Sequence, residues 1–160
     1  MSSPTSSLDQ GAGGVAHTKR LAYLHLAPGS ALPPMSARRP FRAIVIAEQM
    51  VSPVWQSSVS DWLVHSGCLY MMAWGADCSA WDDAVDWAIL QVFDYGDIPD
   101  DQFVMTTWHT DETLDEVFRF AESSSAHPTI ELDETLLVHI ANEASEQTLL
   151  AAYREAIASP

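Results

Sequence analysis

Apolar runs and amphipathic stretches alternate along the chain after residue 40. Short continuous apolar runs are typical of strands buried on both faces, and four occur, at 43–47, 68–75, 103–108 and 135–140. Between them, apolar residues recur at helical spacing, as in the stripe of Trp81, Ala84, Val85, Ala88, Ile89 and Val92. Strands alternating with helices favour a parallel sheet with right-handed crossovers. The pattern predicts a three-layer α/β/α fold, Rossmann-like or flavodoxin-like, with a mostly parallel sheet of about four to five strands.

Local signals mark where the helices begin and end. Ser52 followed by Pro53 is a favourable helix start, and Gly67 is placed to end that helix. After the central run at 68–75, Ser79 fits the N-cap position of the next helix. Thr113 and Glu116 have the spacing of a capping box.

The first 40 residues differ in composition from the rest. Residues 1–18 are rich in Ser, Gly and Thr and are expected to be disordered, and residues 27–40 are Pro-rich and predict an irregular linker. A short edge strand is possible at 21–26. We therefore expect an N-terminal extension at 1–40 and a single α/β domain at 41–160.

Targeting signals are missing from the sequence. The N-terminus has no apolar segment of the kind that secretory signals carry, and no run approaches the ~18 apolar residues of a membrane span. Cys68 and Cys78 bracket the central strand. Their separation of roughly 30 Å along an extended chain far exceeds the ~6 Å that a disulfide allows. We expect a cytoplasmic protein with no membrane association.

Charge is distributed unevenly. Five of the seven basic residues lie before residue 43, whereas residues 43–160 hold 21 acidic residues and only Arg119 and Arg154 as cations. Such a body repels phosphate backbones, so nucleic-acid binding by the body is not expected. A basic protein partner explains the charge, and so does solubility alone.

Polar residues follow each predicted strand. If the strands are parallel, their carboxyl ends share one edge, where ligands bind in open α/β sheets. The residues that would meet there are Glu48, Asp77, Cys78, His109, Asp111, Asn142 and Glu143. Helix capping alone also explains polar residues at such turns.

Three of these residues are catalytic candidates: Asp77, Cys78 and His109. Asp77 and His109, with Glu48, could hold a divalent metal ion. Alternatively, Cys78 near a helix N-terminus could be a nucleophile with His109 as its base. Otherwise Cys78 is a small packing residue.

Two tryptophans end strands at the same presumed edge. Trp74 and Trp108, with Asp77, His109 and Asp111, could line one aromatic and acidic cleft. Such a surface suits a protein anchor or a cationic ligand, and core packing is the alternative.

Familiar cofactor and catalytic signatures are absent. The sequence has no G-x-G-x-x-G, P-loop, C-x-x-C, H-E-x-x-H or G-x-S-x-G motif. We expect no bound cofactor.

The block from Trp74-Gly75 through Asp77-Cys78-Ser79 to Trp81-Asp82-Asp83, together with 106–109 and 116–118, resembles an uncharacterised bacterial domain family over about residues 41–142. That family has no assigned activity. The resemblance implies a small bacterial cytoplasmic protein.

Two functional hypotheses remain. The first, which we favour, is an acidic, non-catalytic protein-interaction module of the immunity or accessory type. The second is a hydrolase-like enzyme with a metal or cysteine site at the carboxyl ends of the strands.

Overall fold

The structure is a computed structural model that describes residues 19–35 and 39–159. The expected disorder of residues 1–18 lies outside the described residues. No helix among the described residues is long and apolar enough to cross a membrane. Both cysteines are free and buried, as their predicted separation requires.

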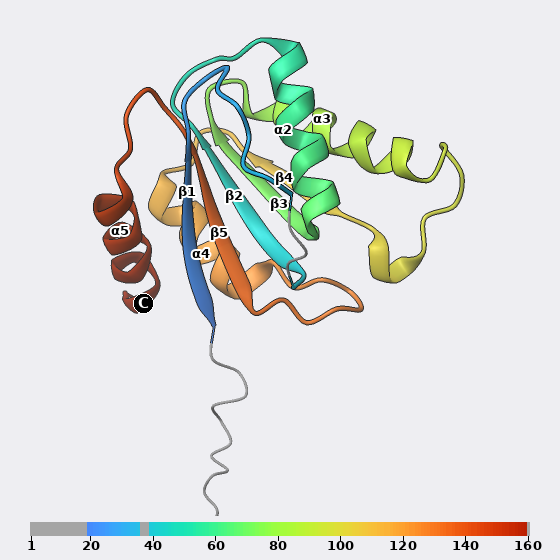
Figure 1. Cartoon of the computed structure of the whole chain (residues 1–160). Helices are drawn as coiled ribbons and strands as arrows, with labels where there is room; N and C mark the ends of the chain where they lie inside the picture. The colour runs from blue at the N-terminus through green and yellow to red at the C-terminus, as the bar shows by residue number, and fades with distance from the viewer. Residues whose placement is uncertain (1–18, 36–38, 160) are drawn as a thin grey trace, which may run out of the picture.

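Five parallel strands form one sheet in the order β1-β5-β2-β3-β4 (Figure 1). They are β1 (Arg20–Leu26), β2 (Phe41–Ala47), β3 (Cys68–Gly75), β4 (Met105–His109) and β5 (Glu134–Ile140). β2 is buried along its whole length, and β3 and β5 nearly so, as the apolar runs predict. The predicted parallel sheet is confirmed.

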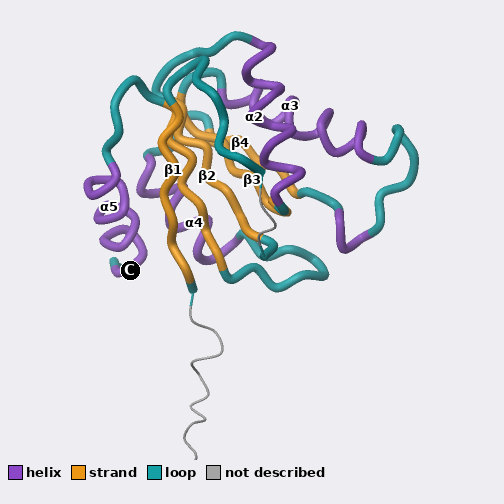
Figure 2. Tube along the Cα trace, in the orientation of Figure 1, coloured by secondary structure: helices purple, strands orange, loops and turns teal. Residues whose placement is uncertain are grey.

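In the part of the chain that the structure describes, four α-helices cover the two faces of the sheet. They are α2 (Pro53–Ser66), α3 (Cys78–Val92), α4 (Leu114–Ser124) and α5 (Glu146–Ala158), with a short 3-10 helix η2 (Asp100–Gln102) before β4. α2 packs against α3, and α4 packs against α5. Figure 2 shows the two pairs on opposite sides of the strands. The chain moves from β2 to β4 in one direction and then reverses to β5, so right-handed crossovers put α4 on the other face. The three-layer α/β/α fold is confirmed.

Two of the predicted helix starts are confirmed. The Ser52 side chain accepts a hydrogen bond from the backbone of Trp55, and Gly67 ends α2 in the left-handed region at φ 108°. Thr113 and Glu116 form the capping box at the start of α4.

The predicted start of α3 at Ser79 is wrong. The helix begins at Cys78, and Asp77 occupies the N-cap position with φ 57° and no side-chain capping bond. The reason is a tight turn after β3, in which Gly75 has φ 101° and the amide of Ala76 donates to the carbonyl of Ala47. A Cβ on Gly75 would lie 2.1 Å from that carbonyl oxygen, so only glycine fits.

The N-terminal part of the described chain is integrated into the sheet. β1 pairs with β5 over seven residues and forms one edge, so the sheet begins at Arg20, ahead of the expected domain start at residue 41. In the linker that follows, the carbonyls of Ser30 and Pro33 accept hydrogen bonds from the indoles of Trp55 and Trp62. These two α2 side chains hold the linker against the helix.

Candidate functional site

The carboxyl edge of the sheet carries a row of large side chains on one face. Strand register aligns residues from all five strands, and side chains at matching positions of parallel strands share a face. The row runs His25, His139, Ile46, Trp74 and His109. The His109 ring packs edge-on against Phe120 of α4, with centroids 4.8 Å apart, so the row faces the layer of α4 and α5.

β2 and β5 meet at the switch point of this topology. The chain leaves β2 for α2 and leaves β5 for α5, which lie on opposite faces. In open α/β sheets, ligands bind in the crevice where the connections diverge in this way. Glu48 follows β2 directly, and His139 is the penultimate residue of β5.

A hydrogen-bonded line of three side chains occupies the switch point. Nε2 of His139 lies 2.6 Å from Oε2 of Glu48, and its Nδ1 lies 2.7 Å from the hydroxyl of Tyr23. The backbone N–H of Ser145 donates to that hydroxyl. We assign Tyr23 as donor to Nδ1 and Nε2–H as donor to Glu48, which satisfies every member. His139 is fully buried, whereas the Glu48 side chain is 53% exposed.

His109 is also engaged within the protein. Its Nε2 lies 2.9 Å from Oγ1 of Thr107, and its Nδ1 lies 3.1 Å from Oε1 of Glu112. The Cys78 thiol contacts Oγ1 of Thr110 at 3.8 Å. Both ring nitrogens of the proposed base therefore have partners other than the proposed nucleophile.

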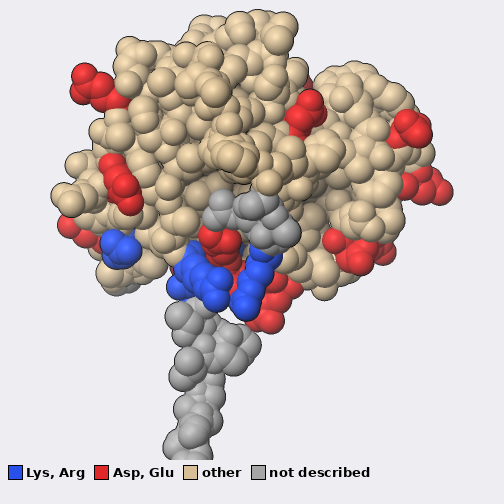
Figure 3. Space-filling view, viewed as in Figure 1, with Lys and Arg blue, Asp and Glu red and all other residues tan. Residues whose placement is uncertain are grey.

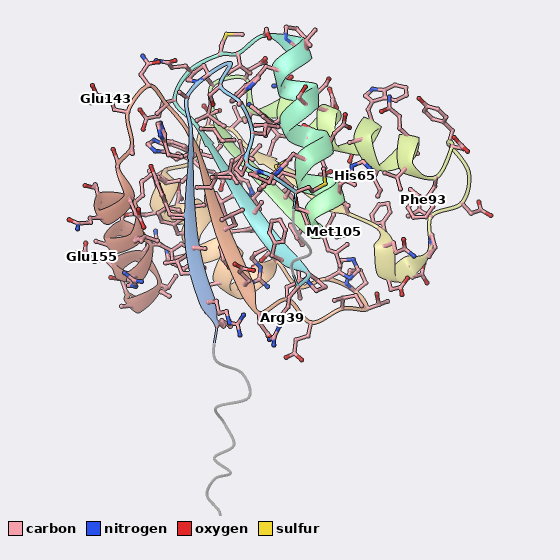
Figure 4. All side chains as sticks on the ribbon, in the orientation of Figure 1. Arg39, His65, Phe93, Met105, Glu143 and Glu155 are labelled. Atoms are coloured by element: carbon pink, nitrogen blue, oxygen red, sulfur yellow. The ribbon has the colours of Figure 1, made fainter. Side chains whose placement is uncertain are left out.

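The other candidates at this edge do not form a metal-binding group among the described residues. Asp77 and Asp111 are exposed and take left-handed backbone angles in their turns. Glu143 is exposed and points away from the molecule (Figure 4). Within residues 19–35 and 39–159, no group of three or more His, Cys, Asp or Glu side chains is placed to hold a metal ion. The structure does not assemble Glu48, Asp77 and His109 as a ligand set.

The two strand-end tryptophans lie on opposite faces of the sheet. Trp74 pairs in register with His109, and its indole donates to the carbonyl of Glu112. Trp108 is one residue earlier in β4, so its side chain points to the face of α3. The two rings do not line one cleft.

A second region carries exposed aromatic side chains, two from α3 and the loop after it and two from the open edge strand β4 and the segment before it. Trp87, Tyr95, Phe103 and Trp108 are each between 44% and 60% exposed, and the Trp87 and Tyr95 rings contact at 6.1 Å. Between α3 and β4 lies a groove of about 440 Å³, lined by Asp86, Ile89, Leu90, Ile98, Phe103, Met105 and Thr106. Phe93 and Met105, labelled in Figure 4, mark the end of α3 and the start of β4. We call the groove with Asp82 and the four aromatic residues the α3–β4 surface.

Two carboxylates of this surface lack a cationic partner. Asp86 accepts a hydrogen bond from Oγ1 of Thr106 at 2.9 Å. Burial raises the pKa of Asp86; the Thr106 bond opposes this, and the charges of Asp82 and Asp83 add to it. Asp82 is only 6% exposed, and its Oδ1 has no hydrogen-bond partner. No ion pair joins either carboxylate to a cation in the part of the chain that the structure describes.

The amino end of the sheet gathers most of the described Lys and Arg residues, as Figure 3 shows where the chain enters β1 and β2. A cavity of about 500 Å³ there is lined by Lys19 and Arg42, but also by Glu122, Glu131 and Asp133. Lys19 pairs with Glu122 at 2.7 Å. Burial lowers the pKa of Arg42, and nearby Tyr153 and Glu122 oppose this. The cations of this end are therefore balanced by local acids.

The position of His139 within an apolar strand predicts a hydrogen-bonded core histidine, and the structure confirms this. Sequence reasoning missed its partner Tyr23 and gave Asp82 no functional assignment. The partners of His139 come from β1 and from the residue after β2, so only the strand order reveals them.

The fold defines a small α/β protein with a parallel sheet. A family model described as a domain of unknown function (DUF7684) matches residues 21–156, and the chain belongs to that family. No functionally curated protein and no solved structure matches the chain significantly.

Proposed function

We propose that this protein is an acidic, non-catalytic interaction module that binds a basic protein through the α3–β4 surface. The observation that carries the proposal is the group of exposed aromatic rings on α3 and on the edge strand β4 with its flanking segments. Tryptophan and tyrosine are enriched among the residues that dominate protein–protein binding energy. Exposed aromatic side chains that contact one another supply such anchors without a large rearrangement of the free protein.

Charge supports a basic partner. No Lys or Arg occurs between Arg42 and Arg119, a segment that includes α2, β3, α3 and β4. The same segment contributes exposed carboxylates that lie close in the sequence to the groove residues: Asp83, Asp94, Asp100 and Asp101. Complementary charge speeds association and is screened by salt. The complex should therefore weaken as ionic strength rises.

The finer assignment rests on the same proposal. A small bacterial cytoplasmic protein of the immunity or accessory type fits an acidic surface that neutralises or carries a basic partner. Solubility alone would explain the charge but not the exposed rings, which lower solubility.

The test uses the full chain immobilised and its native host lysate, with cross-linking to locate the contact. A paired variant Phe103→Ala/Trp108→Ala removes two anchors, and Ile157→Ala removes an exposed apolar residue on α5 as a control. We expect a basic protein that cross-links to 86–108, is retained by Ile157→Ala and is lost with the paired variant. Retention by the paired variant, or the absence of any specific partner, would refute the proposal.

One observation favours the enzyme alternative over a purely structural role for the carboxyl edge of the sheet. Glu48 is a half-exposed carboxylate held by a buried histidine at the switch point, an arrangement that suits a general base. A hydrolase of this kind would use Glu48, His139 and Tyr23. Turnover of a panel of activated esters and phosphoesters that disappears in Glu48→Gln would support it, and no turnover by the wild type would exclude it for those substrates.

A further inference from the structure

The groove of the α3–β4 surface combines apolar walls with a carboxylate. Ile89, Ile98, Phe103 and Met105 contribute carbon surface, and Asp86 is a charged lining residue. A space of about 440 Å³ is far larger than a water molecule needs and accommodates a long side chain.

Asp82 lies beside the groove, outside its lining. It lies one helical turn before Asp86, so the two share a side of α3. More than nine-tenths of Asp82 is buried, and its Oδ1 accepts no hydrogen bond among the described residues. A buried carboxylate without a partner is costly, and the natural compensation is a cationic hydrogen-bond donor. Within the described residues, no Lys or Arg forms an ion pair with Asp82 or Asp86.

We propose that the groove receives an arginine or lysine side chain of the basic partner, with its methylene stem on the apolar walls and its cation on Asp86, where the nearby charge of Asp82 adds to the attraction. Long cationic side chains bury their stems on apolar surface while the head group makes polar contacts. Charge-assisted hydrogen bonds to carboxylates are among the strongest in proteins. This inference rests on the proposed docking surface and names the chemistry of its anchor.

The geometry also explains why Asp86 is held as it is. The Thr106 hydroxyl occupies one Asp86 oxygen and fixes the carboxylate beside the groove. The pKa of Asp86 is raised mainly by burial, and a bound cation would lower it again.

The test uses two synthetic peptides, acetylated and amidated, of alternating valine and arginine or of valine and citrulline. Citrulline keeps the shape of arginine and removes its charge. Binding to the full chain is measured by calorimetry at low salt, for wild type, Asp86→Asn, Asp82→Asn and the control Asp100→Asn. Asp86→Asn keeps an acceptor for Thr106, and Asp100 is exposed in η2, so the variants differ in place and not in charge.

We expect the arginine peptide to bind and the citrulline peptide not to bind. Asp86→Asn should weaken binding about tenfold, and Asp82→Asn should weaken it less, because Asp82 lies outside the groove lining. Asp100→Asn should weaken binding by less than about twofold. Equal weakening by all three variants would mean diffuse attraction and would overturn the anchor. Citrulline binding as tight as arginine binding would overturn it too.

The two proposals fail separately. Suppose that Phe103→Ala/Trp108→Ala loses the host partner, but Asp86→Asn weakens peptide binding no more than Asp100→Asn does. The docking surface would then be supported and the cationic anchor refuted. If the paired aromatic variant has no effect on the partner, the docking surface falls, whatever the peptides do.

Discussion

The carboxyl edge of the sheet and the α3–β4 surface both gather ionisable side chains, and the two regions differ in how those groups are partnered. At the edge, both nitrogens of His139 and both nitrogens of His109 have hydrogen-bond partners within the protein. On the α3–β4 surface, Asp82 has a buried oxygen without a partner, and Asp86 is paired with a hydroxyl and no cation.

The difference separates ionisable groups that are paired within the protein from carboxylates that have no cationic partner among the described residues. A hydrogen bond satisfied inside the protein contributes modestly to stability, whereas an unpartnered buried group carries its full desolvation cost. The edge network ties β1, β5, β2 and the start of α5 together through Tyr23, His139, Glu48 and Ser145. On the α3–β4 surface, the Asp82 oxygen without a partner carries this cost in the free protein.

The largest effect is expected at Gly75, where the carboxyl edge leads into α3. Gly75→Ala should lower the free energy of unfolding by more than about 3 kcal/mol, because its Cβ would meet the Ala47 carbonyl at a positive φ. Gly29→Ala is the matched control, with φ 80° and open space around it, and should cost about 1 kcal/mol. Urea denaturation of both variants checks this. Equal losses would mean that the close approach at Gly75 has no energetic weight.

The next largest effect concerns the edge network. His139→Leu keeps the volume roughly and leaves Tyr23 and Glu48 without their partner, so we expect a loss of about 2–3 kcal/mol. Tyr23→Phe should cost less, and the double variant should cost less than the two single losses together. Denaturant midpoints measure all three. Additive losses would show that the three side chains do not act as one network.

On the α3–β4 surface, we expect a substitution that raises the free energy of unfolding. Asp82→Asn removes an unpartnered buried charge and should raise the free energy of unfolding by up to about 1 kcal/mol. Asp83→Asn, on the exposed side of the same helix turn, should change it by less than about 0.5 kcal/mol. Thermal and urea unfolding report both. Destabilisation by Asp82→Asn would indicate that the charge is satisfied in the native protein.

The smallest effect is a pH dependence at Asp86. Its pKa in the folded state lies above the ordinary value of 3.8, so the folded protein holds that proton more tightly than the unfolded chain does. As the pH rises from 3.8 through the folded pKa, wild type loses the stability that the more tightly held proton on Asp86 contributes. Asp86→Asn has no such proton and loses nothing. The stability of Asp86→Asn relative to wild type should therefore increase across that window and stay constant above it. A flat difference from pH 3 to 7 would contradict the raised pKa.

Much of the fold was predictable from the sequence because strands buried on both faces consist of consecutive apolar residues. The runs at 43–47 and 68–75 lie within β2 and β3, and the caps at Ser52 and Thr113 lie where local chemistry requires them. The start of α3 was missed because it depends on the contact between Gly75 and β2, which is not a local property.

The candidate site was harder to predict because side-chain partners depend on strand order and on single-residue register. His139 meets Tyr23 and Glu48 only because β5 lies between β1 and β2. Trp74 and Trp108 both end strands, but a one-residue offset puts them on opposite faces. Asp82 gave no sequence signal, because a helical aspartate beside an exposed one is usually solvated.

The most direct test compares the same loss of charge in the two regions. The affinity of the captured basic partner is measured for Asp86→Asn, on the α3–β4 surface, and for Glu48→Gln, at the carboxyl edge. We predict that Asp86→Asn weakens binding about tenfold and that Glu48→Gln changes it by less than about twofold. Weakening by Glu48→Gln equal to or greater than that by Asp86→Asn would contradict the assignment of the docking surface.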